Sequence, residues 1–284
     1  MDQNYIEVIM QLLYDYKIPR IDYTKIKMEK QVGEGGQAKV YQGEYKGEIV
    51  AVKVITDIDI KCLVHEIAIM AKLEHPCIAK FHGMVLEKNF LAYVTQFVSG
   101  KTMDEWKISD FKEELRIKIM KSISDALNYL HKNNCVHRDL KPENIMLDKN
   151  NNVFLIDFGI AKVLTGKKKI LTRAKGTVNY LAPETLDAEE VNDDDQILSV
   201  VTPEVDVWAF GCLCSYLFSG AIPWTPKYKD NAVKIQKLLA SKVEFPIPPN
   251  ITNNAALSII KMATIIEPKK RASMAQINEI VQNL

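Results

Sequence analysis

The chain has 284 residues, of which 47% are hydrophobic and 26% charged, a composition typical of globular proteins rather than of disordered or fibrous ones. Its 37 Lys and Arg nearly balance its 36 Asp and Glu, which argues against a surface that binds nucleic acid or membranes through its overall charge. No N-terminal basic region precedes an apolar run, and no run approaches ~18 uninterrupted apolar residues, so we expect neither secretion nor a membrane span.

The five cysteines are widely spread and include no CxxC pair of the kind that holds zinc. Cys212 and Cys214 lie in an apolar run, where packing in a core is far commoner than a redox role. We therefore expect reduced thiols and a cytoplasmic location, with the nucleus as the alternative.

Residues 1–25 predict an N-terminal helical extension, because apolar side chains recur between Tyr5 and Tyr16 before Pro19 stops the helix. Its role stays open between packing on the rest of the protein and binding a regulatory partner. Residues 26–96 predict a small lobe of five antiparallel strands and one main helix. Three β-type runs with glycine-bearing turns span 25–55, a helix precedes Pro76, and two more strands cover 78–86 and 90–98.

Residues 97–284 predict a second, mainly helical lobe, so the fold class is α+β. A long amphipathic helix is expected over 110–132, with Asp110 and Glu113 capping its start. A buried helix is expected over 205–218, and two more over 259–266 and 277–284. Residues 185–201 hold six carboxylates without Lys or Arg, a pattern typical of a solvated loop.

Chemistry-bearing residues begin with Gly33, Gly35 and Gly36, which lie between two predicted strands where backbone N–H groups can approach a polyphosphate. By themselves they indicate a hairpin turn more often than a phosphate site, and no helix follows as in Rossmann or P-loop sites. Lys53 on the third strand and Glu66 on the next helix would form an ion pair aimed at the phosphates, although each is by default a solvated charge.

The stretch 137–144 reads HRDLKPEN, and one predicted strand later the chain reads DFG at 157–159. Phosphoryl transfer needs a base for the acceptor proton, hard oxygen ligands for magnesium, and fixed positive charge near the phosphates. These parts are supplied in turn by Asp139, by Asn144 with Asp157, and by Lys53 with Lys141.

Together with APE at 182–184, DVWAFG at 206–211 and Arg271, these motifs resemble the signature set of the eukaryotic protein kinases across residues 26–284. The resemblance implies a two-lobed kinase-like fold that transfers the γ-phosphate of ATP, with Mg2+ or Mn2+, to hydroxyl groups of protein substrates. Lys141 and Thr177 resemble the serine/threonine type, with dual specificity as the alternative. The stretch 41–55 and Thr95 resemble the tyrosine-kinase-like branch. Ala38 stands where the family usually has a third glycine, which weakens the glycine-loop argument.

The resemblance also implies the role of each site residue. Asp139 would act on the acceptor hydroxyl, Lys141 on the γ-phosphate, and Lys53 paired with Glu66 on the α- and β-phosphates, while Asn144 and Asp157 would hold the metal. The glycine loop, the adenine pocket with its gatekeeper Thr95, and the hinge would contact ATP through Val32, Gly33, Glu34, Gly35, Gly36, Gln37, Ala38, Lys39, Val40, Ala51, Lys53, Thr95, Gln96, Val98 and Met146.

Regulation is implied by Arg138, which would bind a phosphate on the activation segment 157–184. Thr172 is the expected regulatory site, and Thr165 is the second candidate. Glu184 and Arg271 match the buried ion pair of the family. The acidic run 187–195 would favour basic substrates if it is more than a solvated loop.

Two alternatives compete with a protein kinase. A pseudokinase would bind partners without catalysis, but it would usually lack one of five residues that are all intact here: Lys53, Glu66, Asp139, Asn144 and Asp157. A kinase for small molecules is disfavoured by the APE motif, by Thr177 and by the pairing of Glu184 with Arg271.

Overall fold

The computed structural model describes residues 3–284 apart from 35–37, 57–62, 64–66, 88–89, 159–160, 164–169, 173–176, 188–189, 192–196 and 230. The chain forms two compact units. The first comprises Met1–Gly100 with Ile156–Gly159, and the second comprises Lys101–Leu155 with Ile160–Leu284.

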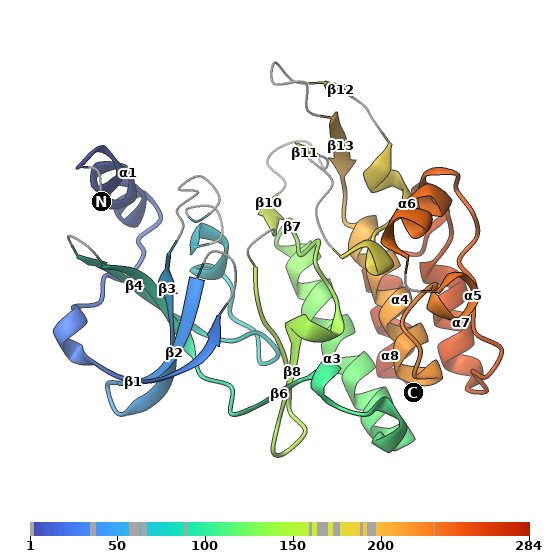
Figure 1. The fold of residues 1–284 in the computed structure, drawn as a ribbon, viewed down its shortest axis with the longest axis horizontal. Coiled ribbons are helices and arrows are strands. Elements are labelled where there is room, and N and C mark those ends of the chain that lie inside the picture. The colour runs from blue at the N-terminus through green and yellow to red at the C-terminus, as the bar shows by residue number, and fades with distance from the viewer. Residues whose placement is uncertain are drawn as a thin grey trace. The chain divides into compact units, whose positions relative to one another are not determined.

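The first unit is built on a five-stranded antiparallel sheet of order β1-β2-β3-β5-β4, which confirms the predicted strands (Figure 1). Tyr45 pairs with Glu48 across a two-residue turn in which Lys46 and Gly47 both have positive φ, the turn that matches the twist of a hairpin. The strands are β1 Ile26–Glu34, β2 Ala38–Tyr45, β3 Glu48–Ile55, β4 Phe81–Glu87 and β5 Phe90–Gln96.

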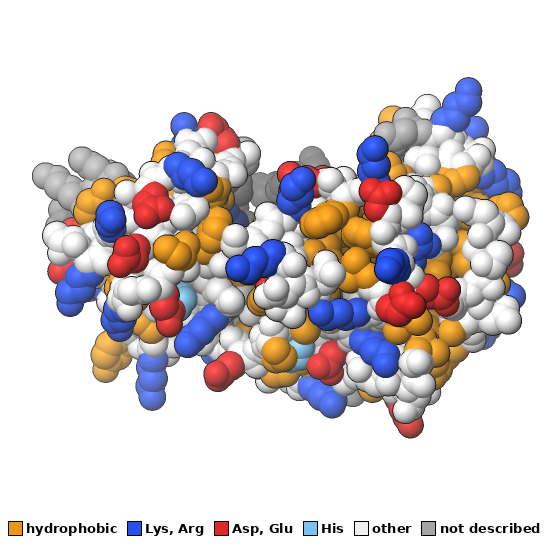
Figure 2. Space-filling view, turned by 90° about the horizontal axis from the view of Figure 1, so that it is seen from below, with side chains coloured by type: hydrophobic (Ala, Val, Ile, Leu, Met, Phe, Trp, Pro, Cys, Tyr) orange, Lys and Arg blue, Asp and Glu red, His pale blue; other side chains and the backbone are white. Residues whose placement is uncertain are grey.

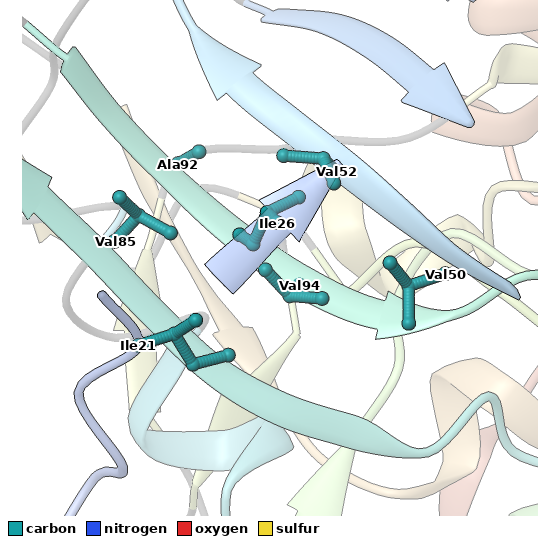
Figure 3. Close-up of a cluster of buried hydrophobic side chains, with 7 residues drawn as sticks. All are labelled: Ile21, Ile26, Val50, Val52, Val85, Ala92 and Val94. Atoms are coloured by element: carbon teal, nitrogen blue, oxygen red, sulfur yellow. The ribbon is translucent and has the colours of Figure 1, made fainter. Parts of the chain in front are cut away.

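A cluster of aliphatic side chains forms the core on one face of this sheet (Figure 3). It comprises Ile21, Ile26, Val50, Val52, Val85, Ala92 and Val94. Ile21 comes from outside the sheet, from the segment between α1 (Gln3–Asp15) and the short 3-10 helix η1 (Tyr23–Lys25). The helix predicted between Tyr5 and Tyr16 is thus confirmed, and residues 67–70 are also helical.

The second unit is mainly helical, as predicted, and α4 (Glu204–Ser219) is its buried centre. The α4 helix packs closely on α7 at Gly211, where an added Cβ would lie 2.8 Å from the Cβ of Ala263. The other helices are η2 Met103–Glu105, η3 Ile108–Asp110, α3 Glu113–Lys132, η4 Pro142–Asn144, η5 Val178–Tyr180, η6 Pro183–Leu186, α5 Thr225–Tyr228, α6 Ala232–Ala240, α7 Asn254–Ala263, η7 Pro268–Lys270 and α8 Met274–Gln282.

The predicted capping of the long helix by Asp110 and Glu113 is wrong. Asp110 ends η3, where its N–H donates to the Lys107 carbonyl, and the N-cap of α3 is Lys112, which makes no side-chain capping bond. The Glu113 carboxylate instead accepts a hydrogen bond of 2.6 Å from Asn253. Glu113 therefore links two helices rather than capping one.

The C-terminal helices begin earlier than predicted because each has a side-chain N-cap. Asn253 Oδ1 accepts from the Ala256 N–H at 2.8 Å and starts α7, which ends at Ala263 rather than at residue 266. Ser273 and Gln276 form a capping box that starts α8 at Met274.

Short strands make up the rest of the second unit. One sheet has the order β6-β8-β9, from Gly100–Thr102, Ile145–Asp148 and Val153–Leu155, and β7 Cys135–Val136 pairs with β10 Lys162–Val163. A third sheet has the order β11-β13-β12, from Ile170–Thr172, Ile197–Val201 and Glu190–Val191. The prediction that 185–201 is simply a loop is wrong, because most of its apolar C-terminal part forms β13, the central strand of this sheet.

Charged side chains of both signs are interspersed over the face shown in Figure 2, in keeping with the near-zero net charge. Among the described residues, no helix is long and apolar enough to cross a membrane. Cys77, Cys135, Cys212 and Cys214 form no disulfide, and Cys62 lies outside the described residues. Burial raises the pKa of Cys135 to about 12, so this thiol stays protonated and packs as an apolar group.

Candidate functional site

The loop between β7 and β8 brings together Asp139, Lys141 and Asn144. Asn144 sits at the end of η4, which Pro142 starts, and its Nδ2 donates to the Asp139 carbonyl at 2.7 Å and to Asp139 Oδ2 at 3.0 Å. Lys141 Nζ lies 3.0 Å from the same Oδ2 and donates a hydrogen bond of 3.0 Å to Thr177 Oγ1. The Asp139 carboxylate is thus held by the Lys141 ammonium and the Asn144 amide, and the Thr177 hydroxyl in turn holds the ammonium.

This loop is fixed to α4 by Asp206, which is fully buried. Asp206 accepts hydrogen bonds from the backbone N–H groups of His137 at 2.8 Å and Arg138 at 2.7 Å, and His131 Nε2 lies 2.9 Å from Asp206 Oδ2. Arg138 has φ 72°, an unusual conformation for a non-glycine residue, and these bonds hold it there. The motif at 206–211 was recognised in the sequence, but this anchoring role and His131 were missed.

Burial alone would raise the pKa of Asp206, yet the net pKa lies below the usual value. The hydrogen bond to His131, the charges of His131 and His137, and the Arg138 N–H together outweigh the cost of burying the carboxylate. Asp206 is therefore held ionised beneath the loop. The missed signal was an acidic residue in the first turn of an otherwise apolar helix, where a buried carboxylate needs partners.

In the first unit, Lys53 and Asp157 lie together. Lys53 is in β3 opposite Val40 of β2 and Tyr93 of β5, and its Nζ lies 3.7 Å from Asp157 Oδ1 and 5.3 Å from the centroid of the Tyr93 ring. Asp157 has φ 62°, and the neighbouring Phe158 is buried. The Glu66 predicted to pair with Lys53 lies outside the described residues.

The residues expected to contact ATP lie mostly on strands. Val32, Gly33 and Glu34 end β1, Ala38, Lys39 and Val40 begin β2, Ala51 faces Thr95 in the β3–β5 register, and Met146 is in β8 of the second unit. Lys39 Nζ lies 3.5 Å from Glu34 Oε1, and a hydrogen bond from Gln31 together with Lys39 lowers the pKa of Glu34. Gly35, Gly36 and Gln37 lie outside the described residues.

In the predicted hinge, Gln96 to Val98, one backbone group is already hydrogen-bonded within the first unit. The Gln96 N–H donates to the Lys80 carbonyl at 2.7 Å, so it does not offer this group to a ligand, and Val98 is buried. Of the regulatory candidates, Thr172 ends β11 with Ser199 as its partner in β13, while Thr165 lies outside the described residues.

The predicted buried ion pair is confirmed. Arg271 Nη1 lies 2.7 Å from Glu184 Oε1, Nη2 lies 3.1 Å from Oε2, and the Arg271 side chain is 0% exposed. The same guanidinium donates to the carbonyls of Glu204, Ile265 and Ile266. Arg271 therefore holds together η6, the start of α4 and the segment that follows α7.

Comparison with known proteins agrees with the resemblance to protein kinases. The family model described as protein kinase domain matches residues 26–281. The chain is 32% identical over 259 residues to the probable serine/threonine-protein kinase MARK-A of Dictyostelium discoideum, which covers 87% of this chain and 23% of that protein. It is 30% identical over 276 residues to the serine/threonine-protein kinase CTR1 of Arabidopsis thaliana, with 93% and 32% covered.

The CBL-interacting protein kinase 10 of Oryza sativa subsp. japonica is 28% identical over 266 residues, which cover 90% of this chain and 56% of that protein. The chain thus spans between about a quarter and somewhat over half of the length of the curated relatives that it matches.

Proposed function

Since the chain belongs to the protein kinase family, we propose that it transfers the γ-phosphate of ATP to serine or threonine hydroxyls of protein substrates. The observation that carries this proposal is the cluster around Asp139, in which Lys141 and Asn144 both engage Oδ2. Relatives named serine/threonine-protein kinases support the same reaction.

Asp139 is proposed to act on the acceptor hydroxyl. Its Oδ2 is engaged by Lys141 and Asn144, so Oδ1 is the oxygen that would receive the hydroxyl proton. As the new oxygen–phosphorus bond forms, the bond between the γ-phosphorus and the oxygen bridging to the β-phosphate breaks, and the electron pair leaves with ADP. Lys141, steadied by Thr177, would balance charge on the γ-phosphoryl oxygens.

The metal would be held by Asn144 and Asp157. The Nδ2 of Asn144 donates to Asp139, which leaves the amide oxygen as the candidate ligand atom, and Asp157 offers a carboxylate. Hard oxygen donors of this kind suit Mg2+, which is usually bound by few protein groups together with substrate phosphates, and Mn2+ would be accepted as well. When bound, the metal would neutralise phosphate charge, while Lys53 would bind the α- and β-phosphates with Glu66 as its partner.

The test is transfer of labelled phosphate from Mg2+-ATP to a general protein substrate, followed by hydrolysis to identify the phosphorylated residue. We expect phosphoserine or phosphothreonine with the unaltered chain and at least a hundredfold less with Asp139→Asn, since positioned acid–base groups contribute about 100- to 10,000-fold. Asp110→Asn, at an exposed position in η3, is the matched control and should keep full activity. Equal transfer by the Asp139 and Asp110 variants would refute the proposal.

Regulation by phosphorylation of Thr172 is part of the proposal. Arg138 would receive the phosphate, with Thr165 as the second candidate site. Thr172→Ala should lower the activity of phosphorylated enzyme, whereas Thr165→Ala should leave it unchanged. Full activity of Thr172→Ala would exclude this site.

The finer assignments rest on the sequence. We propose membership of the tyrosine-kinase-like branch from the stretch 41–55 and Thr95, a cytoplasmic location, and lobes at 26–96 and 97–284 after an extension at 1–25. A small gatekeeper at Thr95 should admit inhibitors that occupy a pocket behind the adenine. Enlarging it in Thr95→Met should reduce their affinity much more than that of ATP.

A further inference from the structure

The segment between α1 and η1 adds a short strand-like stretch to the free edge of the sheet. The Met84 N–H donates to the Pro19 carbonyl at 2.8 Å, and the Ile21 N–H donates to the Met84 carbonyl at 2.7 Å, so Arg20 forms a parallel bridge with Met84 of β4. Figure 1 shows this chain leaving α1 and running along β4 before it reaches η1 and β1. We call residues 16–21 the strap.

Side chains also fix the strap. Arg20 Nη2 donates to the Leu86 carbonyl of β4 at 3.0 Å, Ile18 is buried, and Ile21 is 2% exposed within the core of the sheet (Figure 3). The sheet leaves room for it at Gly83, which has φ 149° and where an added Cβ would clash with the Pro19 carbonyl oxygen. The strap is therefore an integral part of the first unit.

A rigid turn joins the strap to α1. The Lys17 N–H donates to Tyr14 O at 3.1 Å and the Ile18 N–H donates to Leu13 O at 2.8 Å, with Lys17 in the left-handed region at φ 51°. Such bonds back onto the last turn close a helix C-terminus and fix the direction of the chain that follows. Ile9 and Leu13 of α1 are buried as well, so the helix before the strap also packs through apolar side chains.

The strap also reaches the helical stretch that follows Glu66 in the sequence. Lys72 Nζ lies 5.0 Å from the centroid of the Tyr16 ring, a cation–π contact. Lys72 ends that stretch, since the N–H groups of Ala71 and Lys72 donate to the carbonyls of Ile67 and Ile69. The edge of β4 and the end of this helix are thus tied together by one short segment.

We infer that the strap is a positioning element for phosphoryl transfer, in which Arg20 sets the strap on β4 and Tyr16 restrains the helical stretch 67–70, which directly follows Glu66 in the sequence. This inference rests on the proposed function, because it assumes that Glu66 pairs with Lys53 and that the helix must be in place for the pair to form. Losing the contact of Arg20 with Leu86 or that of Tyr16 with Lys72 should lower the fraction of molecules in which this helical stretch is placed for Glu66 to pair with Lys53. Neither residue belongs to the groups proposed above to act on ATP or on the acceptor hydroxyl.

The experiment compares amide hydrogen exchange at residues 67–72 in the full chain without nucleotide, so that the readout does not depend on activity. Tyr16→Leu removes the ring and should speed exchange there about two- to fivefold, the factor expected from one exposed cation–π contact. Tyr16→Phe keeps the ring and should match the unaltered chain. Tyr14→Leu is the matched control, because Tyr14 is in α1 and 81% exposed. Arg20→Met should speed exchange at 67–72 and also at Ile21 and Met84.

Phosphate transfer is then measured on the same variants. We expect kcat/KM to fall about two- to fivefold in Tyr16→Leu and Arg20→Met, and to be unchanged in Tyr16→Phe and Tyr14→Leu. Equal exchange in the Tyr16→Leu and Tyr14→Leu proteins would overturn the inference, as would faster exchange with unaltered kcat/KM. Failure of the proposed function itself would show separately, as transfer that survives Asp139→Asn.

Discussion

At the scale of single residues, Thr177 determines where the charge of Lys141 lies. Its hydroxyl accepts a hydrogen bond from the ammonium that also lies 3.0 Å from Asp139 Oδ2. Thr177→Val keeps the shape of the side chain but removes this acceptor, and a hydrogen bond to a charged group contributes about 1.5 to 3 kcal/mol. We expect kcat to fall at least tenfold, measured by steady-state phosphate transfer.

Thr177→Ser is the matched control, because serine keeps the hydroxyl and loses only a methyl group. It should retain most of the activity. If valine and serine reduced kcat equally, the hydrogen bond would not be the reason, and loss of packing at this position would explain both results.

Asp206 predicts a specific dependence of stability on pH. Its folded pKa is lowered, so the ionised carboxylate stabilises the fold above the unfolded pKa of about 3.9, and this contribution is lost as the pH falls through the lower folded value. Asp206→Asn should therefore reduce the free energy of unfolding by about 1 to 3 kcal/mol at pH 7. In urea titrations the difference from the unaltered chain should stay constant down to about pH 5 and shrink below about pH 4. A difference independent of pH down to pH 3 would contradict this role.

At the scale of elements, the contact between α4 and α7 depends on Gly211. A methyl group there would lie 2.8 Å from both Ala263 Cβ and Thr264 Cγ2, so the helices would have to separate. Overpacking costs about 1 to 3 kcal/mol, which outweighs the gain of about 1 kcal/mol from placing alanine in a helix. Gly211→Ala should therefore lower the free energy of unfolding in urea titrations.

A compensating change checks the cause of that loss. Gly211→Ala combined with Ala263→Gly removes one of the two clashing groups and should recover part of the stability. A single variant as stable as the unaltered chain would show that α7 can shift without cost.

Helices and strands that are marked by a local pattern of apolar residues could be predicted from the sequence. Strands β1 to β5 and the apolar helix α4 follow from runs of apolar residues bounded by glycine or proline. The ends of helices were predicted less well, because Asp110 and Asn253 are both plausible caps by residue type and only the backbone geometry shows that Asn253 caps α7 while Asp110 closes η3. The strand β13 was missed because acidic residues before it dominate the composition of 185–201.

At the scale of the whole molecule, contacts between residues far apart in the sequence can be predicted only where a family pattern links the two residues. Glu184 and Arg271 are 87 residues apart, and their pairing was expected because both match family motifs. His131 and Asp206 are 75 residues apart, and no local pattern indicated that they would meet. The strap was missed for the same reason, because its pairing with β4 joins segments more than 60 residues apart, which composition and periodicity do not report.

Because the chain forms two units, a change at Arg271 should destabilise the second unit without affecting the first. Its guanidinium is fully buried against Glu184, and removing one partner of such a pair costs about 3 to 5 kcal/mol because the other charge is left buried alone. Arg271→Met should lower the melting temperature of the second unit by roughly 6 to 20 °C, measured by calorimetry. Amide exchange at Val50, Val52 and Val94, in the core of the first unit, should not change.

The adjacent residue supplies the control. Lys270 also forms an ion pair, 2.7 Å from Glu267 Oε2, but its side chain is 71% exposed, and exposed pairs contribute about 0 to 1 kcal/mol. Lys270→Met should therefore shift the melting temperature by no more than a few degrees, at about 2 to 4 °C per kcal/mol. Similar shifts for the two variants would mean that Arg271 acts only as a surface charge, whereas a large shift confined to Arg271→Met would show that η6, α4 and the segment after α7 depend on one buried guanidinium.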